Sequence, residues 1–120
     1  MAEHNELGNK GEQMAVDSLI EKGYTILERN FRFKHLEADI IARIENLLVV
    51  IEVKTRQYEF MAGPEKTVTK KKQRSIIKVA NHYIEEHDWD DETRFDIISI
   101  ILNEKELKIE HLEDAFYPTL

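Results

Sequence analysis

Residues 37–56 read EADIIARIENLLVVIEVKTR and decide the fold of this chain. They contain an unbroken run of branched apolar residues, Leu47 to Ile51, which is typical of a strand covered on both faces. A second apolar segment, Glu37 to Arg43, precedes this run, and only a few residues around Glu45 and Asn46 separate the two. We therefore predict a hairpin whose second strand is central in a sheet.

Hydrophobic patterns on both sides of the hairpin complete a mixed α/β domain. Small and apolar residues recur at helical spacing over residues 7–19, and Gly23 follows them as a left-handed helix stop. The remaining predicted elements are a strand over residues 24–33, a loop over 57–65, a helix from about residue 68, and strands over 95–102 and 107–111. The order αβββαββ predicts a mixed central sheet flanked by helices, in one domain of residues 1–120.

Composition narrows the functional classes. The 120 residues include no Cys, which excludes a disulfide scaffold, a thiolate nucleophile and an iron–sulfur cluster, so any metal must bind oxygen or imidazole. No apolar run approaches the ~20 residues of a membrane span, and the start of the chain lacks a signal-peptide pattern, so we expect a cytoplasmic protein with no membrane partner. The net charge of −7 is uneven, because residues 1–84 have a balance of +2 and residues 85–120 a balance of −9. The acidity belongs to the C-terminal segment.

Four charged residues lie at the end of the predicted hairpin away from its turn. A two-residue turn would place Asp39 opposite Glu52 and Glu37 opposite Lys54, with all four side chains on one face. A one-residue bulge would offset this register. Directly opposed Cβ atoms are about 4.5–5.5 Å apart, and like charges at that distance destabilise the pair unless something neutralises them. A divalent cation held by carboxylate oxygens would do so.

These residue types match the needs of phosphodiester hydrolysis. A Mg²⁺ or Mn²⁺ ion on Asp39 and Glu52 would activate a water, and Lys54 would stabilise negative charge on the phosphate. In the structural alternative, Lys54 forms an ion pair with Glu37 or Glu52 at the end of the sheet, and Asp39 is solvated. Spacing alone leaves both interpretations open.

A cluster of basic residues marks the start of the second predicted helix. Residues 65–78 contain one acid and six cations, Lys66, Lys70, Lys71, Lys72, Arg74 and Lys78. Cations at a helix N-terminus oppose the helix dipole, so their accumulation favours an anionic partner such as the phosphates of DNA. A solvated lysine face is the alternative. Gln73 lies among apolar positions of this helix, so we expect its amide to hydrogen-bond toward the carboxylates or to lie at the core margin.

Glu12 on the first predicted helix is a further candidate. It directly follows Gly11 and lies four positions after Gly8, and a Gly inside a helix costs about 1 kcal/mol relative to Ala, so paired glycines indicate close backbone approach to another element. A glutamate beside such a contact could reach the sheet. The alternative is a solvated side chain on an ordinary helix flank.

The motifs assembled so far resemble those of a known family. They are Gly8 with Gly11-Glu12, Gly23-Tyr24, Arg29-Asn30, Glu37 to Ala42, Glu52 to Arg56, and Arg94-Phe95-Asp96. In this order they resemble the YraN family of small bacterial proteins over nearly the whole chain. That family is similar in fold to restriction endonucleases of the PD-(D/E)XK type and, within them, to archaeal Holliday-junction resolvases. Two positions depart from the pattern, because Leu36 stands where the family usually has Gly and Ala38 where the nuclease motif has Pro.

The resemblance implies a restriction-endonuclease-like domain with defined catalytic residues. Asp39, Glu52 and Lys54 would form an Asp…Glu-x-Lys core, and Glu12 would be the acidic residue carried by the helix. The Val53 carbonyl would complete the metal shell. The supporting and DNA-binding residues expected around this core are Glu37, Gln73, Arg56, Lys70, Lys71, Arg74 and Lys78.

We accordingly expect a Mg²⁺- or Mn²⁺-dependent endonuclease that acts on structured DNA, such as branched or flapped duplex. Resolvase-like relatives act as dimers, so a homodimer is a candidate assembly here, although no stripe in the sequence identifies its surface. One alternative is a non-catalytic DNA-binding or assembly module that retains the nuclease fold. Another is a protein-interaction role for the acidic segment that begins at about residue 85.

Overall fold

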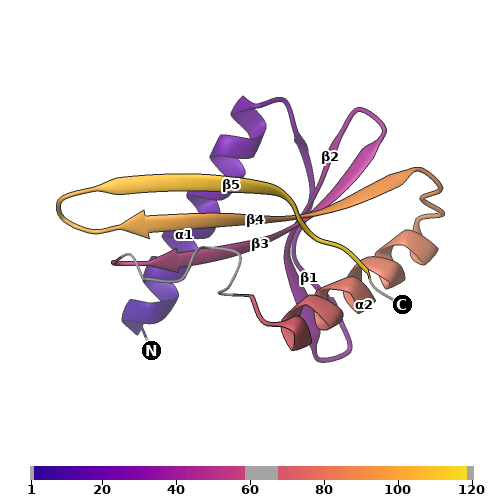
Figure 1. Cartoon of the computed structure of the whole chain (residues 1–120), viewed down its shortest axis with the longest axis horizontal. Helices are drawn as coiled ribbons and strands as arrows, with labels where there is room; N and C mark the ends of the chain where they lie inside the picture. Colours follow the sequence, from indigo (N-terminus) through magenta and orange to yellow (C-terminus); the bar gives the residue numbers. More distant parts are fainter. Residues whose placement is uncertain (1, 59–67, 119–120) are drawn as a thin grey trace.

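Helices and strands follow one another in the predicted order in the computed structural model, which describes residues 2–58 and 68–118 (Figure 1). The elements are α1 (Ala2–Glu21), β1 (Thr25–Phe33), β2 (Leu36–Ile44), β3 (Leu47–Arg56), α2 (Lys70–Glu86), β4 (Glu92–Leu102) and β5 (Leu107–Phe116). The predicted α/β class and the order αβββαββ are confirmed. Most of the loop predicted over residues 57–65 lies outside the described residues.

The strands form one mixed sheet in the order β1-β2-β3-β4-β5, so β3 is central, as predicted. Neighbouring strands are antiparallel except for β3 and β4, which are parallel. A parallel pair needs a crossover connection, and α2 lies between these two strands in the sequence. The two helices pack on opposite faces of the sheet (Figure 1).

The apolar run of β3 supplies both faces of the sheet because successive side chains of a strand point in opposite directions. Leu48 and Val50 join the core under α2, whereas Val49 and Ile51 join the core under α1. All four side chains are fully buried. Burial of such a side chain contributes roughly 1.5–3 kcal/mol, which explains why this strand anchors the fold.

The hairpin of β2 and β3 has the predicted register as far as its backbone pairing extends. The paired residues run from the turn, where Glu45 has a φ of 52°, to the pair formed by Ile40 and Ile51. The next opposed positions would be Asp39 and Glu52, the two carboxylates of the predicted site. The strands therefore separate just where those side chains begin.

The alternation of side chains along β2 breaks at the same place. Ala38 and Ile41 are three positions apart, yet both pack in the core under α2. Ile40 and Ala42 both pack in the core under α1. In a regular strand Ala38 would share a face with Ile40, so the strand changes face around Asp39.

The end of β5 differs from the sequence prediction. β5 runs to Phe116 rather than to His111, because its pairing with β4 continues through an irregularity between Phe95 and Ile97. The residues after His111 do not alternate regularly between apolar and polar, so periodicity alone could not detect this part of the edge strand.

Neither described helix is long and apolar enough to cross a membrane.

Candidate active site

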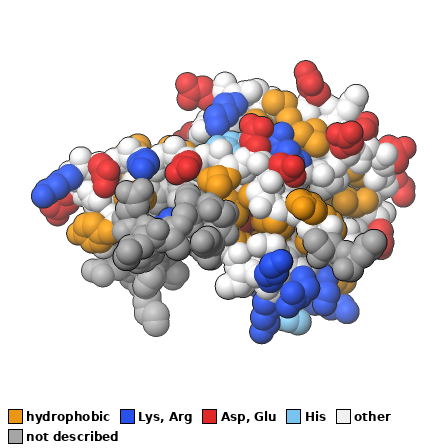
Figure 2. Space-filling model, in the orientation of Figure 1, with side chains coloured by type: hydrophobic (Ala, Val, Ile, Leu, Met, Phe, Trp, Pro, Cys, Tyr) orange, Lys and Arg blue, Asp and Glu red, His pale blue; other side chains and the backbone are white. Residues whose placement is uncertain are grey.

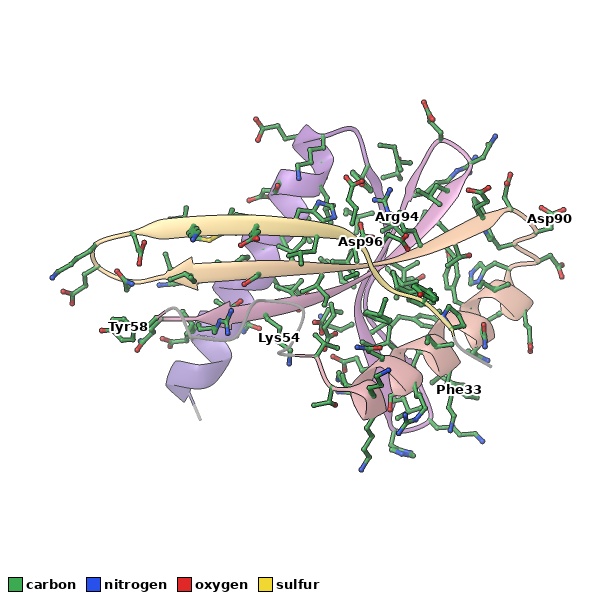
Figure 3. The ribbon with its side chains drawn as sticks, in the orientation of Figure 1. Phe33, Lys54, Tyr58, Asp90, Arg94 and Asp96 are labelled. Carbon is green, nitrogen blue, oxygen red and sulfur yellow. The ribbon has the colours of Figure 1, made fainter. Side chains whose placement is uncertain are left out.

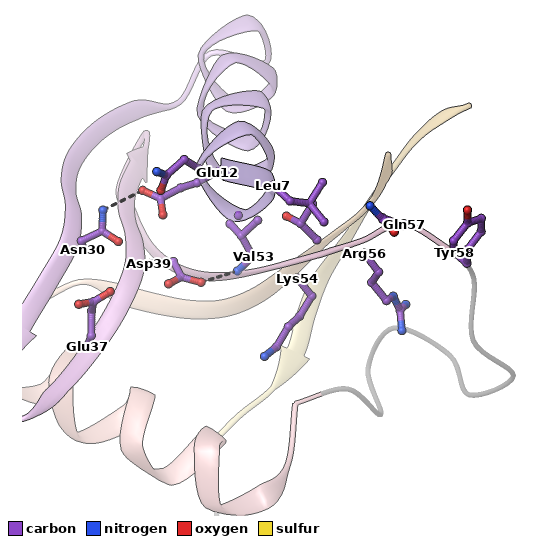
Figure 4. A pocket seen from close by; sticks show the side chains of 13 residues that line it. Leu7, Glu12, Asn30, Glu37, Asp39, Val53, Lys54, Arg56, Gln57 and Tyr58 are labelled. Atoms are coloured by element: carbon purple, nitrogen blue, oxygen red, sulfur yellow. Dashed lines mark hydrogen bonds between the residues drawn. The ribbon is translucent and has the colours of Figure 1, made fainter. Parts of the chain in front are cut away.

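A cleft of about 780 Å³ lies beside the second half of β3 and brings most of the predicted catalytic residues together, whereas Glu52 is buried and does not line it (Figure 4). Its walls come from α1, β1, β2 and β3 and from the two residues that follow β3. The lining residues are Leu7, Gly8, Asn9, Glu12, Asn30, Glu37, Asp39, Val53, Lys54, Thr55, Arg56, Gln57 and Tyr58.

Asp39 is held in the cleft by the backbone of the neighbouring strand. Its Oδ2 accepts a hydrogen bond of 2.8 Å from the Val53 N–H (Figure 4). The carboxylate thereby takes the place of a main-chain acceptor where the β2–β3 ladder has ended. The interpretation in which Asp39 is merely solvated is wrong, because its carboxylate is fixed beside the Glu52-Val53-Lys54 element.

Glu52 is a buried carboxylate with too few hydrogen-bond donors. Its side chain is 4% exposed, and its Oε1 has no hydrogen-bond partner within the described residues. Burial, together with the charge and close approach of the Asp39 carboxylate, raises the pKa of Glu52 from 4.5 to about 8. The Lys72 ammonium, 3.6 Å from Oε2, acts in the opposite direction, as does the charge of Lys54.

Lys54 does not form the ion pair with Glu37 or Glu52 that the structural alternative predicts. Glu37 instead pairs with Arg32 of β1 across a distance of 2.9 Å, and the carboxylate of Glu52 pairs with Lys72. Among residues 2–58 and 68–118, Lys54 forms no ion pair within 4.0 Å. Its ammonium therefore remains available to a phosphate in the cleft that it lines together with Glu37 (Figure 4).

Glu12 reaches the cleft from α1 and is fixed there by β1. Its Oε1 accepts hydrogen bonds from Asn30 Nδ2 at 2.9 Å and from Arg29 Nε at 3.3 Å. Asn30 presents its amide from a left-handed backbone conformation with a φ of 52°. The carboxylate is 13% exposed and lines the cleft, so it is not an ordinary solvated side chain of a helix flank.

The close approach predicted at Gly8 and Gly11 is confirmed only at Gly11. A Cβ on Gly11 would collide with the side chain of Thr55 on β3, so the absence of a side chain lets α1 approach the strand closely. Gly8, in contrast, has no atom of the described residues within 4 Å of its Cβ position, and the prediction that it makes a close contact is wrong. Gly8 lines the open cleft instead.

The predicted DNA-binding cations are exposed along α2. Thr69 caps the helix, because its side chain accepts a hydrogen bond of 3.1 Å from the Lys72 N–H. Basic side chains gather on the lower surface around this helix (Figure 2). The exposed cations of its first half are Lys70, Lys71, Arg74 and Lys78. No acid lies in the first turn of α2, so no side chain of that turn offsets the charge of the cations.

Gln73 occupies the second of its two expected positions, and Arg56 makes a contact that the sequence did not predict. Gln73 donates a hydrogen bond of 3.1 Å to the Val68 carbonyl and so lies at the core margin rather than toward the carboxylates. Arg56 lines the cleft, but it also donates a hydrogen bond of 3.4 Å to Ser99 on β4. Arg56 is thus partly a structural link between the two parallel strands.

The donor set fits a hard divalent cation. Asp39 and Glu52 offer carboxylate oxygens, and one buried oxygen of Glu52 lacks any hydrogen-bond donor in the described part of the chain. A cation would relieve that deficit and the repulsion that raises the pKa of Glu52. The described residues bring no three His, Asp or Glu side chains together as a metal cluster. Two carboxylates nevertheless match Mg²⁺, which keeps several waters and completes its shell with substrate phosphate.

Sequence reasoning missed several residues that shape the site. Lys72 lies four positions before Ile76, in the buried stripe of α2, and that spacing could have identified it as the cation facing the sheet. Asn30 was part of a family motif, but nothing in the local pattern indicated that its amide would hold Glu12. Gln57 and Tyr58, at the outer end of the cleft, carried no signal at all.

Comparison with known proteins gives relatives that cover the whole chain. The family described as "Uncharacterised protein family UPF0102" matches residues 11–100. The chain is 50% identical over 117 residues to a UPF0102 protein of Christiangramia forsetii, with 98% of each chain covered. It has the same identity and coverage with the UPF0102 protein FP2501 of Flavobacterium psychrophilum. A UPF0102 protein of Phocaeicola vulgatus is 46% identical over 120 residues, which cover 100% of this chain and 99% of that protein.

Proposed function

The chain belongs to the UPF0102 family, which is YraN-like, and from this premise and the geometry of the cleft we propose that it is a metal-dependent endonuclease. The proposed reaction is hydrolysis of phosphodiester bonds in branched or flapped DNA, with Mg²⁺ or Mn²⁺. One observation carries the proposal. The Asp39 carboxylate is fixed on the Val53 N–H at 2.8 Å, next to a Glu52 oxygen that is buried without a hydrogen-bond donor in the described residues.

The charged residues of the inner cleft, and Glu52 buried behind it, have distinct roles in this proposal. Asp39, Glu52 and the Val53 carbonyl would hold the cation, which when bound lowers the pKa of a water and polarises the phosphate. Lys54 places its ammonium beside the scissile phosphate and stabilises the negative charge that develops there. Glu12, held by Asn30 at 2.9 Å, orients a water at the α1 wall of the cleft.

The surface around the cleft supports an anionic polymer as substrate. The exposed cations at the start of α2 lie on the helix whose Lys72 contacts Glu52 at 3.6 Å, so the basic surface adjoins the carboxylates. Phosphates flanking the cleaved bond would bind there. Such contacts release condensed counterions, so we expect DNA affinity to fall steeply with salt.

The experiment that tests this function separates metal binding from cleavage. Mn²⁺ and Mg²⁺ are titrated calorimetrically into the wild type and Asp39→Asn, and the same samples are incubated with labelled four-way and flapped DNA. We expect Asp39→Asn to lose metal binding and at least about 100-fold of the cleavage rate, because it removes a ligand. Asp17→Asn is the matched control, since Asp17 is an exposed carboxylate of α1 that bonds only Gln13 at 2.9 Å in the described structure. Wild-type cleavage by Asp39→Asn would contradict the proposal.

A second candidate function is a non-catalytic DNA-binding module. It is favoured by the 3.6 Å ion pair of Lys72 with Glu52, because an ammonium there offsets part of the carboxylate charge without a metal. In that case, changing Lys71, Arg74 and Lys78 to Gln would weaken DNA binding and lower the salt slope by about 2 to 3, whereas Asp39→Asn would have no effect. Binding of DNA without metal binding or cleavage would select this function.

A further inference from the structure

The cleft continues past the carboxylates to an outer end that the proposed chemistry does not use. Figure 4 shows Asp39 and Glu12 toward one end and Gln57 and Tyr58 at the other. Tyr58 is 69% exposed, and no other described ring stacks against it. A large aromatic side chain left open to solvent at the wall of a cleft offers a free face to a flat ligand.

The backbone beneath this outer end is anchored. Asn103, in the turn between β4 and β5, donates a hydrogen bond of 2.6 Å to the Gln57 carbonyl. The Asn103 side chain also accepts hydrogen bonds from the backbone N–H groups of Lys105 and Glu106, at 2.8 Å and 3.0 Å, so the anchor is itself held. The position of Gln57, and with it the start of Tyr58, is set before any ligand binds. Pre-ordering of this kind reduces the entropic cost of binding.

The inner and outer parts of the cleft carry different charges and so suit different parts of a nucleic acid. The carboxylates Glu12, Glu37 and Asp39 line its inner part, and none of the described lining residues beyond Val53 is acidic. The outer part carries the cations Lys54 and Arg56, followed by an amide and a phenol ring. Cations suit phosphates, whereas an amide and an aromatic ring suit the edge and the face of a base.

The distance from Lys54 to Tyr58 fits a DNA strand that lies along the cleft. Tyr58 follows Lys54 by four residues, which span at most about 14 Å. At about 3.4 Å for each stacked nucleotide, this distance covers only a few nucleotides. A strand with its scissile phosphate at Lys54 would therefore bring a nearby base to Tyr58.

We propose that Gln57 and Tyr58 form a base-binding subsite for an unpaired nucleotide near the cleaved bond, so that the cleft takes the single-stranded part of flapped DNA. The inference rests on the proposed nuclease function and names the substrate feature that its site recognises. In an intact duplex each base is paired and both of its faces are stacked, so Tyr58 has nothing to stack on. An unpaired base offers a free face, and such stacking contributes about 1–3 kcal/mol for each base.

The test compares binding of two fluorescein-labelled DNAs by anisotropy, one a flapped duplex and the other the same duplex without the flap. EDTA is present throughout, so the measurement does not depend on cleavage. Tyr58→Ala should weaken binding to the flapped DNA between about 5-fold and 150-fold and leave the intact duplex within about 2-fold. Tyr58→Phe keeps the ring and should bind both DNAs like the wild type. Tyr117→Ala is the matched aromatic control for flap specificity, because Tyr117 is 67% exposed and lines a separate hollow beside Lys70, Arg74 and Lys78, where any loss of binding should be equal for the two DNAs.

Three outcomes would overturn the subsite. They are unchanged flap binding by Tyr58→Ala, an equal loss on flapped and intact DNA, and an equal flap-specific loss in Tyr117→Ala. Failure of the nuclease function has a different signature, because a wild type that never cleaves with Mg²⁺ or Mn²⁺ could still show the Tyr58 effect in EDTA. A wild type that binds neither DNA would contradict both proposals.

Discussion

Two buried carboxylates on neighbouring strands have opposite electrostatic environments. Glu52 of β3 and Asp96 of β4 are 4% and 0% exposed, and the two strands pair in parallel at this level of the sheet. Glu52 faces α2 and has a raised pKa, whereas Asp96 has a lowered pKa. Two buried carboxyl groups therefore differ in protonation, because Glu52 is disposed to keep its proton and Asp96 to lose it.

Hydrogen bonds explain the ionised state of Asp96. Arg94 donates to both of its oxygens, at 2.9 Å and 2.8 Å, and the Asp114 N–H adds a bond of 2.9 Å (Figure 3). His111 Nε2 lies 2.7 Å from Oδ2, and its Nδ1 is 3.1 Å from the Lys22 ammonium, which can only donate, so Nε2 carries the proton given to Asp96. Burial by itself would raise the pKa of Asp96, but the bonds from His111, Arg94 and Asp114 together lower it.

The contrast separates a structural carboxylate, Asp96, from the carboxylate that the proposed metal site would use, Glu52. The donors of Asp96 come from β4 and β5, and Arg94 also bonds the Tyr24 hydroxyl at 2.7 Å, so this network ties the sheet to the segment after α1. Glu52 has instead a second carboxylate beside it and one oxygen without a hydrogen-bond donor in the described residues. A buried oxygen without a donor costs stability, and a bound cation would offset that cost.

The largest expected effect tests this contrast through the same substitution at two positions. Asp96→Asn removes the buried counter-charge of Arg94 and replaces one acceptor oxygen with an NH₂ group that faces other donors, so we expect the free energy of unfolding to fall by about 3–5 kcal/mol in urea denaturation. Asp39→Asn removes a charge that repels Glu52, and its amide oxygen can still accept from the Val53 N–H, so its change should stay within about 1 kcal/mol. Equal losses at the two positions would show that both carboxylates are structural.

The next effect is a pH dependence specific to Glu52. Its pKa lies at about 8 in the folded state, against an ordinary value of 4.5. The folded state therefore retains a proton that the unfolded state has lost, and the stability that the protonated group contributes below pH 4.5 disappears as the pH rises through about 8.

Glu52→Gln removes this loss because the amide does not ionise. Urea denaturation without metal should show the variant gaining on the wild type between pH 5 and pH 8.5, by on the order of 2 kcal/mol. Glu110→Gln, at an exposed carboxylate of β5, serves as the control and should show no such trend. Parallel pH curves for the wild type and Glu52→Gln would remove the distinction between Glu52 and Asp96.

The smallest effect concerns the cation that already faces Glu52. The Lys72 side chain is 43% exposed, so Lys72→Met should cost no more than about 1 kcal/mol of unfolding free energy. The variant should bind Mn²⁺ several-fold more tightly in calorimetry, since the competing ammonium is gone. A loss of about 3–5 kcal/mol without tighter metal binding would make Lys72 the structural counter-ion of Glu52, as the non-catalytic alternative requires.

Local sequence patterns predicted the helices and strands well, but they missed where β2 changes face and where β5 ends. The branched run of β3 identified the central strand, and the short connection at Glu45 set a register that the structure retains. The face change at Asp39 could not be predicted, because no residue there breaks the apolar pattern. The end of β5 was missed for the opposite reason, since an edge strand pairs through its backbone whatever its side chains.

The candidate site divides in the same way. Asp39, Glu12, Lys54 and Val53 line one cleft, as the motifs suggested. Glu52 is buried behind the cleft and does not line its wall. The cation that contacts it, Lys72, comes from α2, which begins eighteen residues after Glu52 in the sequence. Gln73, although it is the neighbour of Lys72, turns to the Val68 carbonyl.

The sequence by itself determined the order of elements, the central strand and the placement of acids and a lysine at the end of the hairpin. These features follow from side-chain periodicity and chain connectivity, which are local. Only the tertiary structure decided that Asp39 bonds the Val53 N–H, that Glu52 is buried near Lys72, and that Asp96 is saturated with donors. Burial and hydrogen-bond supply depend on residues from distant elements, and the pKa of a carboxylate follows from those surroundings rather than from its neighbours in the chain.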